Sequence, residues 1–137
     1  LASSTEGKVT RSSVGYSALD LALYPGLSAT EHIEFSANLR GCDPKAESLL
    51  ESVGLADSSK KPVGQFSTGM RSRLKLAMAI QHEPDLLVLD EPSASLDTNG
   101  VAILDSVIQD QLTRGGLLIA TNDERDRGHA THELQLG

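Results

Sequence analysis

The chain has 137 residues and a formal net charge of -7, and its 39% of hydrophobic residues suffices for one compact core. The acidic balance, the absence of Trp and the presence of only two Tyr and two Phe exclude nucleic acid as the first partner to expect. Cys42 is the single cysteine, which excludes an internal disulfide and a cysteine-based metal cluster. No stretch approaches the roughly 18 apolar residues of a membrane helix, so we expect a cytoplasmic protein.

The first two thirds of the chain predict two short strands followed by three helices. Ser28 and Glu31 have the spacing of a capping box, in which a hydroxyl and a carboxylate satisfy free amides at a helix start. Asp43 followed by Pro44 is typical of another helix start, and Gly54 is typical of a helix end. The expected bounds are strands at 8–9 and 13–16 and helices over 30–40, from 43 to 54 and from 67 to 83.

The last third predicts a β-α-β unit. The run LLVLD, residues 86–90, is continuously apolar, as in a strand buried on both faces of a parallel sheet. A helix follows whose apolar residues share one side, Val101, Leu104 and Ile108. A Gly-Gly pair then introduces LLIAT, residues 117–121, which we expect to be a second buried strand. The tail ELQLG, residues 133–137, predicts one more short strand.

Two adjacent carboxylates, Asp90 and Glu91, stand where the strand over 86–90 ends. Open α/β sheets bind their ligands at this edge. Magnesium prefers oxygen ligands and keeps several waters, so Asp90 is placed to hold the ion and Glu91 to accept a proton from an attacking water. The alternative is that the tripeptide DEP only turns the chain at the end of a strand.

The segment QFSTGM, residues 65–70, predicts a helix start that can bind an anion. Ser67 can cap the helix, while Thr68 and Gly69 leave backbone amides accessible at its positive end. A serine cap near a glycine is more often an ordinary helix start. The order of the segments favours the functional interpretation, because this start precedes a helix, an apolar strand ending in DEP, and then SASLD.

These motifs are similar to those of the ATP-binding cassette (ABC) ATPases. FSTGM resembles a variant of the family's signature motif, LLVLDEP its Walker B strand and SASLD its D-loop, while VGY, LYPGLSATEHI and LLIATND fall in family order. The resemblance implies an α/β fold, with a P-loop NTPase-like parallel sheet core that is incomplete and an inserted α-helical subdomain. Residues 1–16 and 82–137 would form the core and 17–81 the helical subdomain. The exporter branch, including the haem exporter ATPase of cytochrome c maturation, is the most similar.

The resemblance also implies roles for single residues, with ATP and Mg²⁺ as cofactors. The signature residues would contact the γ-phosphate of ATP bound to a second ATPase domain in a head-to-tail dimer: Ser67, Thr68, Gly69 and Met70. Asp90 would assist Mg²⁺ and Glu91 would be the general base. Ser95 and Asp97 would lie at the dimer interface.

Three departures from the family pattern bear on activity. No G-x-x-x-x-G-K-[ST] phosphate loop occurs, and with the initial Leu1 this predicts that the chain is truncated before its Walker A segment. Leu19 stands where the family has a glutamine that senses Mg²⁺ and the membrane partner. Asn122 stands at the switch histidine; it can hydrogen-bond a phosphate oxygen but cannot carry a positive charge.

Other polar residues receive structural interpretations. We expect Arg71 on a solvated helix face and give Arg73 a structural or electrostatic role, because the family usually has arginine there. The histidines have no defensible metal-ligand spacing and are expected at the surface: His32, His82, His129 and His132.

The leading hypothesis is the ATP-hydrolysing subunit of an ABC transporter. It would lie on the inner face of the membrane, bound through residues 17–81 to a membrane permease, and would energise export, with haem as one candidate cargo. Two alternatives are a soluble ABC ATPase without a permease and a non-hydrolysing interaction module. Leu19 and Asn122 are the residues that keep the second alternative open.

Overall fold

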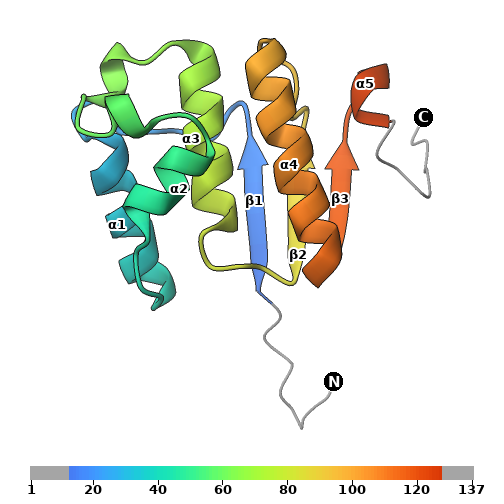
Figure 1. Cartoon of the computed structure of the whole chain (residues 1–137), viewed down its shortest axis with the longest axis horizontal. Coiled ribbons are helices and arrows are strands. Elements are labelled where there is room, and N and C mark those ends of the chain that lie inside the picture. Colours follow the sequence, from blue (N-terminus) through green and yellow to red (C-terminus); the bar gives the residue numbers. More distant parts are fainter. Residues whose placement is uncertain (1–12, 128–137) are drawn as a thin grey trace, which may run out of the picture.

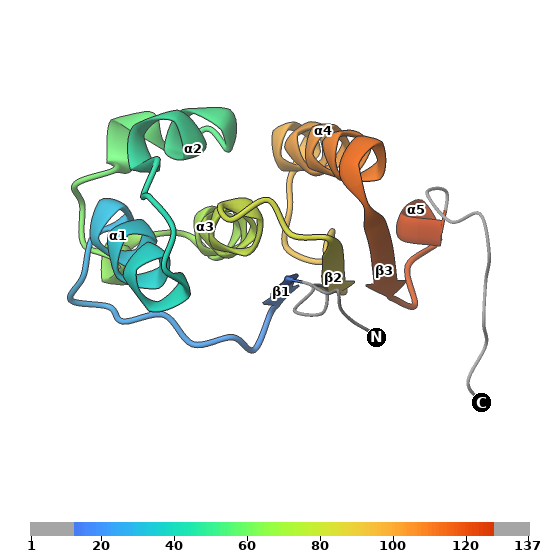
Figure 2. The ribbon, with the colours of Figure 1, turned by 90° about the horizontal axis from the view of Figure 1, so that it is seen from below.

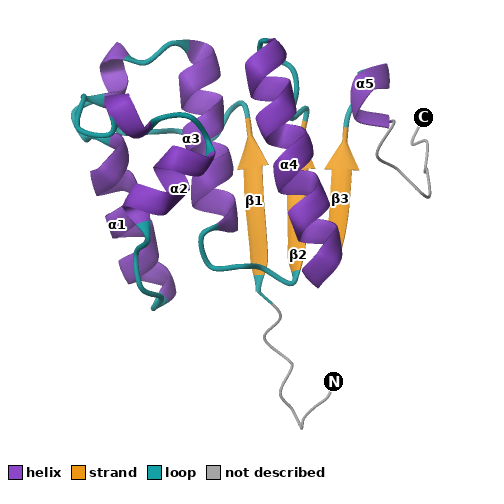
Figure 3. Ribbon diagram, viewed as in Figure 1, coloured by secondary structure: helices purple, strands orange, loops and turns teal. Residues whose placement is uncertain are grey.

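The structure is a computed structural model that describes residues 13–127. In this range three parallel strands lie in the order β1 (Val14–Ala18), β2 (Leu86–Asp90) and β3 (Gly116–Ala120) (Figure 1). The helices are α1 (Ala29–Arg40), α2 (Ala46–Ser52), α3 (Thr68–Ile80), α4 (Thr98–Arg114) and α5 (Glu124–Arg127), with 3-10 turns at Ala56–Ser58 and Val63–Gln65 (Figure 3). The parallel sheet and the α-rich middle confirm the predicted α/β class. The strands predicted at 8–9 and 133–137 lie outside the described residues.

One face of the sheet is covered by α3 and α4, as the view along the strands shows (Figure 2). Leu87 and Leu89 of β2 point into this layer and are fully buried, in a cluster with apolar residues of both helices. No described helix covers the opposite face, where Tyr16 is 43% and Leu118 57% exposed. The prediction of a second buried strand was therefore wrong, because β3 pairs only with β2 among the described strands and keeps one face open.

Gly15 allows β1 to approach α3 closely. A Cβ atom on Gly15 would overlap the carbonyl oxygen of Ala79 and would lie 3.0 Å from the Cγ of Pro84. A larger residue would therefore push the strand away from the helix. This close packing fixes the first half of β1 against the last turn of α3.

The helical part has its own core, formed by α1, α2 and α3 around residues such as Ile33, Leu50 and Leu74. The predicted capping box is confirmed: the Ser28 hydroxyl accepts from the Glu31 amide at 3.1 Å, and the Glu31 carboxylate accepts from the Ser28 amide at 2.8 Å. That backbone hydrogen bond holds the pKa of Glu31 below its usual value.

The predicted start of α2 was wrong, although its end was right. The helix begins at Ala46, because Lys45 at the N-cap has φ -121° and ψ 52°, outside the helical region, and provides no side-chain cap. Asp43 and Pro44 thus lie in the connection from α1. The helix ends at Ser52, shortly before Gly54, whose φ of +73° is the left-handed conformation that glycine adopts without strain.

Candidate functional site

The carboxyl ends of the three strands meet at one edge of the sheet. Ala18, Asp90 and Ala120 are neighbours in register across β1, β2 and β3. Glu91 follows with φ +48°, a left-handed conformation that is unusual for a non-glycine residue, and its amide donates to the Ala120 carbonyl at 2.7 Å. Strained backbone of this kind persists where the surroundings fix it, and it is enriched at functional sites.

The Glu91 carboxylate is held by the loop after β3. Its Oε1 accepts a hydrogen bond from the Asn122 amide at 2.9 Å. Its Oε2 lies 3.3 Å from the Thr121 hydroxyl, which lies closer, at 2.9 Å, to Oδ2 of Asp126. A hydroxyl has one proton to donate, so the shorter contact with Asp126 competes for it. Oε2 is therefore the oxygen of Glu91 that is less firmly bound and better able to accept a proton.

The structure thus brings Glu91 and Asn122 together over 31 residues of sequence, although through the Asn122 backbone amide. Asn122 as a whole is exposed. Sequence reasoning missed Thr121 and Asp126 as partners of this corner. Thr121 directly follows the apolar run of β3, so the rule that polar residues after parallel strands share an edge could have indicated it.

Asp90 is partly buried and lines a small cavity beside Glu91. The end of β1 and the second and third turns of α3 also line this cavity, through Ser17, Ala18, Leu19, Ser72, Lys75 and Leu76. The signature residues at the first turn of α3 are not among those that line this cavity.

The signature residues form the N-terminus of α3, on the same side of the molecule as the strand ends (Figure 1). The Ser67 hydroxyl caps the helix by accepting from the Met70 amide at 3.1 Å. Helix geometry leaves the amides of Thr68 and Gly69 without an intrahelical acceptor, and the helix dipole is positive there. An anion can therefore bind to this end of α3.

Gly69 packs against the loop that follows the two carboxylates. A Cβ atom at Gly69 would lie 3.1 Å from the Ser95 carbonyl oxygen, so the signature motif and Ser95 are neighbours. Asp97 caps α4, because its Oδ1 accepts from the Gly100 amide at 2.8 Å. Sequence reasoning missed this capping role, which the spacing Asp-x-x-Gly at the start of a helix could have indicated.

The two arginines of α3 both bind backbone carbonyls. Arg73 donates through Nη1 to Val53 at 3.1 Å and to Gly54 at 3.3 Å, which is the structural role expected of it. Arg71 was predicted on a solvated face, and its side chain is only partly exposed. Its Nη2 donates to Gly64 at 3.2 Å and its Nε to Val63 at 3.4 Å, because the chain before α3 folds back over its side chain.

His32 is not a surface residue, which corrects the prediction, and His82 is only partly buried. His32 is 3% exposed; its Nε2 accepts from the Tyr24 amide at 3.0 Å, and its Nδ1 lies 2.8 Å from the Ser28 carbonyl. His82 is partly buried, with Nε2 at 3.1 Å from Nη1 of Arg40 and 3.2 Å from the Val14 carbonyl. Burial, helped by Arg40, lowers the pKa of His82. His129 and His132 lie outside the described residues.

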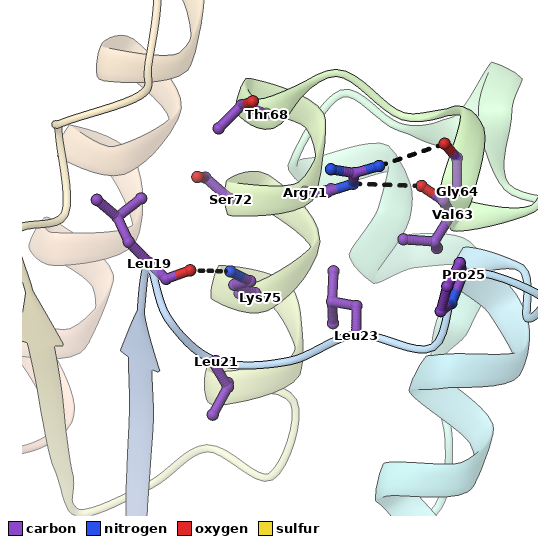
Figure 4. A pocket seen from close by; sticks show the side chains of 10 residues that line it. All are labelled: Leu19, Leu21, Leu23, Pro25, Val63, Gly64, Thr68, Arg71, Ser72 and Lys75. Carbon is purple, nitrogen blue, oxygen red and sulfur yellow. Dashed lines mark hydrogen bonds between the residues drawn. The ribbon is translucent and has the colours of Figure 1, made fainter.

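A larger groove of about 350 Å³ separates α3 from the segment that follows β1 (Figure 4). One side is apolar and is formed by Leu19, Leu21, Leu23, Pro25 and Val63. Arg71 and Lys75 bring positive charge from α3, together with Thr68 and Ser72. The groove therefore suits a partner segment with an apolar face and an acidic group.

A carboxylate at a strand end supplies the oxygen ligand that magnesium prefers. In residues 13–127 no three His, Cys, Asp or Glu residues gather as a metal-binding group. Magnesium in phosphate-transfer sites usually takes one or two protein carboxylates, with waters and substrate phosphates as its other ligands. Asp90 at the strand end fits this role as a single ligand.

Comparisons with known proteins decide the family. The model of the family described as ABC transporter matches residues 2–94. The chain belongs to the ABC transporter family. A solved structure described as the ATP-binding subunit of an ABC transporter aligns with a TM-score of 0.74 and 25% identity, over 85% of this chain and 52% of that one.

Curated relatives of this ABC chain are ATP-binding proteins of transporters. An uncharacterized ABC transporter ATP-binding protein, YxlF of Bacillus subtilis, is 39% identical over 69% of this chain and 34% of its own length. The cytochrome c biogenesis ATP-binding export protein CcmA of Rhodopseudomonas palustris is 34% identical over 85% of this chain and 58% of its own length. The bacitracin transport ATP-binding protein BcrA of Bacillus licheniformis is 44% identical over 57% of this chain and 26% of its own length. The chain thus spans between about a quarter and three fifths of these relatives.

Proposed function

We propose that this chain carries two parts of the ATP-hydrolysing subunit of an ABC exporter. One is the hydrolytic corner, formed by Asp90, Glu91 and the loop after β3, and the other is α3, the signature helix. The observation that supports this most is the Glu91 carboxylate, fixed at the carboxyl edge of a parallel sheet with one oxygen bound to the Asn122 amide and the other less firmly held. That geometry suits a general base. The names of the relatives, which include export and transport ATP-binding proteins, agree with it.

In this proposal Glu91 takes the proton from the water that attacks the γ-phosphate of ATP. The backbone amide of Asn122 binds Oε1 and so orients the Glu91 carboxylate, which leaves Oε2 to accept the proton. Asp90 would hold Mg²⁺, which would supply positive charge to offset the charge that develops on the phosphates. The Asn122 side chain can donate a hydrogen bond to a phosphate oxygen, without the positive charge of a histidine.

The signature residues would act on the ATP of a second ATPase domain. Ser67, Thr68, Gly69 and Met70 form the positive end of α3 and do not line the cavity beside Asp90 and Glu91. A phosphate bound by the second subunit could approach this helix end, as in a head-to-tail dimer. Ser95, which adjoins Gly69, and Asp97 would then lie at the interface.

The groove beside α3 is the proposed docking site for the permease. It combines an apolar wall with the positive charge of Arg71, and it adjoins the cavity beside Asp90 and Glu91 through Leu19. No helix within residues 13–127 is long and apolar enough to cross a membrane. We propose that the chain lies on the cytoplasmic face of the membrane and is attached to the permease through this groove. Haem as the exported cargo stays a prediction.

Turnover of ATP by the full-length gene product with its permease tests the proposal. Glu91→Gln should lower kcat by about 100-fold or more, because a general base contributes at least that factor. Glu83→Gln is a matched control, since Glu83 also has a left-handed backbone, with φ +49°, and lies outside the site. Equal rates in wild type and Glu91→Gln would contradict the proposal, and a rate near zero in both proteins would favour the non-hydrolysing module. Full activity with no permease association would favour the soluble ATPase.

A further inference from the structure

Lys75 is a buried cation in the middle of α3. Only 7% of its surface is exposed, and its Nζ donates to the Leu19 carbonyl at 2.6 Å, across 56 residues of sequence (Figure 4). Burial lowers the pKa of Lys75, and the charge of Arg71 acts in the same direction, while Asp20 opposes them. The ammonium group thus fastens the segment after β1 to the centre of the signature helix.

This contact lies between the groove and the carboxylate corner. Leu19, Ser72 and Lys75 line both cavities. Leu19 directly follows Ala18, which is the register neighbour of Asp90. The position of the Leu19 carbonyl therefore sets how the apolar wall of the groove sits relative to Asp90 and Glu91.

The Leu19 side chain has no polar group, so only the main chain of this residue can form a hydrogen bond. The Lys75 ammonium, which comes from α3, donates to the carbonyl of that main chain. A buried charge is costly, and an apolar side chain of similar size would fill the same space at no such cost. Filling space thus does not explain a lysine here, whereas a strong charge-assisted hydrogen bond to one carbonyl does.

We propose that Lys75 is a positioning residue that locks the wall of the groove to the hydrolytic corner. Its bond to Leu19 keeps the 19–25 segment in place, so that a partner pressing on this wall also moves the surroundings of Asp90 and Glu91. The evidence for this lock is the hydrogen bond from Lys75 to Leu19 and the fact that both residues line the groove and the smaller cavity. Its effect on catalysis rests on the proposed function.

Hydrogen exchange of the 137-residue chain tests the lock. The reporter is the Leu21 amide, which donates to the Ala18 carbonyl at 3.3 Å within the fastened segment. Lys75→Met should speed its exchange about tenfold or more, the effect of losing one hydrogen bond to a charged group. Lys75→Arg keeps a charged donor and should restore slow exchange. Lys61→Met, at an exposed lysine, is the control and should change nothing.

Equal Leu21 exchange in wild type and Lys75→Met would overturn the lock. So would a loss of protection spread evenly over α3 and the sheet, because it would show that Lys75 only contributes to global stability. Thermal unfolding of each variant, measured in parallel, separates a loss of global stability from local opening of the segment after β1.

Steady-state kinetics of the full-length gene product with its permease test the catalytic consequence. Lys75→Met should lower permease-stimulated kcat about tenfold while the KM for ATP stays within about twofold, and Lys75→Arg should recover most of the rate. Unchanged kcat would overturn this part of the proposal. A wild-type protein without ATPase activity would refute the proposed function instead, and hydrogen exchange would still decide whether the lock exists.

Discussion

Replacing Gly15 by alanine tests the close packing of the first half of β1 against the last turn of α3. The added Cβ would overlap the Ala79 carbonyl oxygen and approach Pro84 to 3.0 Å. The first of these is main chain of a helix, which cannot rotate away as a side chain can. The strand must therefore shift, and we expect a loss of about 3 kcal/mol in the free energy of unfolding, the upper end of the usual range for overpacking.

Urea unfolding followed by circular dichroism measures this loss, and a fall of roughly 10 °C in Tm should accompany it. Gly26→Ala is the matched control, because a Cβ there would meet no atom within 4 Å. It should leave stability unchanged or raise it slightly, by restricting the unfolded chain. If Gly15→Ala cost no more than Gly26→Ala, β1 would not lie against α3 as described.

Three further predictions concern a cap, a histidine and nucleotide affinity. Asp97→Ala should cost about 1 kcal/mol by removing the cap of α4, whereas Asp97→Asn, which keeps an acceptor, should cost much less; equal losses in thermal unfolding would contradict the cap. Burial lowers the pKa of His82 below its ordinary 6.5, so the unfolded chain binds more protons below that pH, and the free energy of unfolding should fall with falling pH. His82→Gln should weaken this pH dependence in urea titrations at pH 7.5 and 5.5. An unchanged pH dependence would show that His82 is not the group responsible. Residues 1–137 contain no phosphate loop and should show no micromolar affinity for ATP in calorimetry, and a micromolar Kd would contradict that expectation.

Local signals in the sequence predicted most elements of the fold. The Ser28 and Glu31 pair and the Ser67 cap are short-range patterns, and both are present in the structure. The error at Asp43 arose because a proline after an aspartate also suits a connection. The exposure of β3 could not be predicted, since an apolar run does not reveal whether both faces of its strand are covered.

The candidate site was predictable at its motif residues and not in its contacts. Asp90 and Glu91 could be placed at a strand end from the apolar run before them. The hydrogen bond from Asn122 to Glu91 depends on the pairing of β2 with β3, and the bond from Lys75 to Leu19 depends on the packing of β1 on α3. Contacts of this kind are set by tertiary structure, which periodicity and spacing do not report.

Trapping of an ATP-bound dimer tests the central claim most directly. The full-length gene product carrying Glu91→Gln is incubated with Mg²⁺ and labelled ATP, and its mass and bound nucleotide are measured by size-exclusion chromatography with light scattering. If Glu91 is the base of a composite site, this variant should elute as a dimer that retains uncleaved ATP, while wild type and Glu83→Gln should not accumulate it. A Glu91→Gln protein that stays monomeric, or that releases ADP at the wild-type rate, would contradict the account.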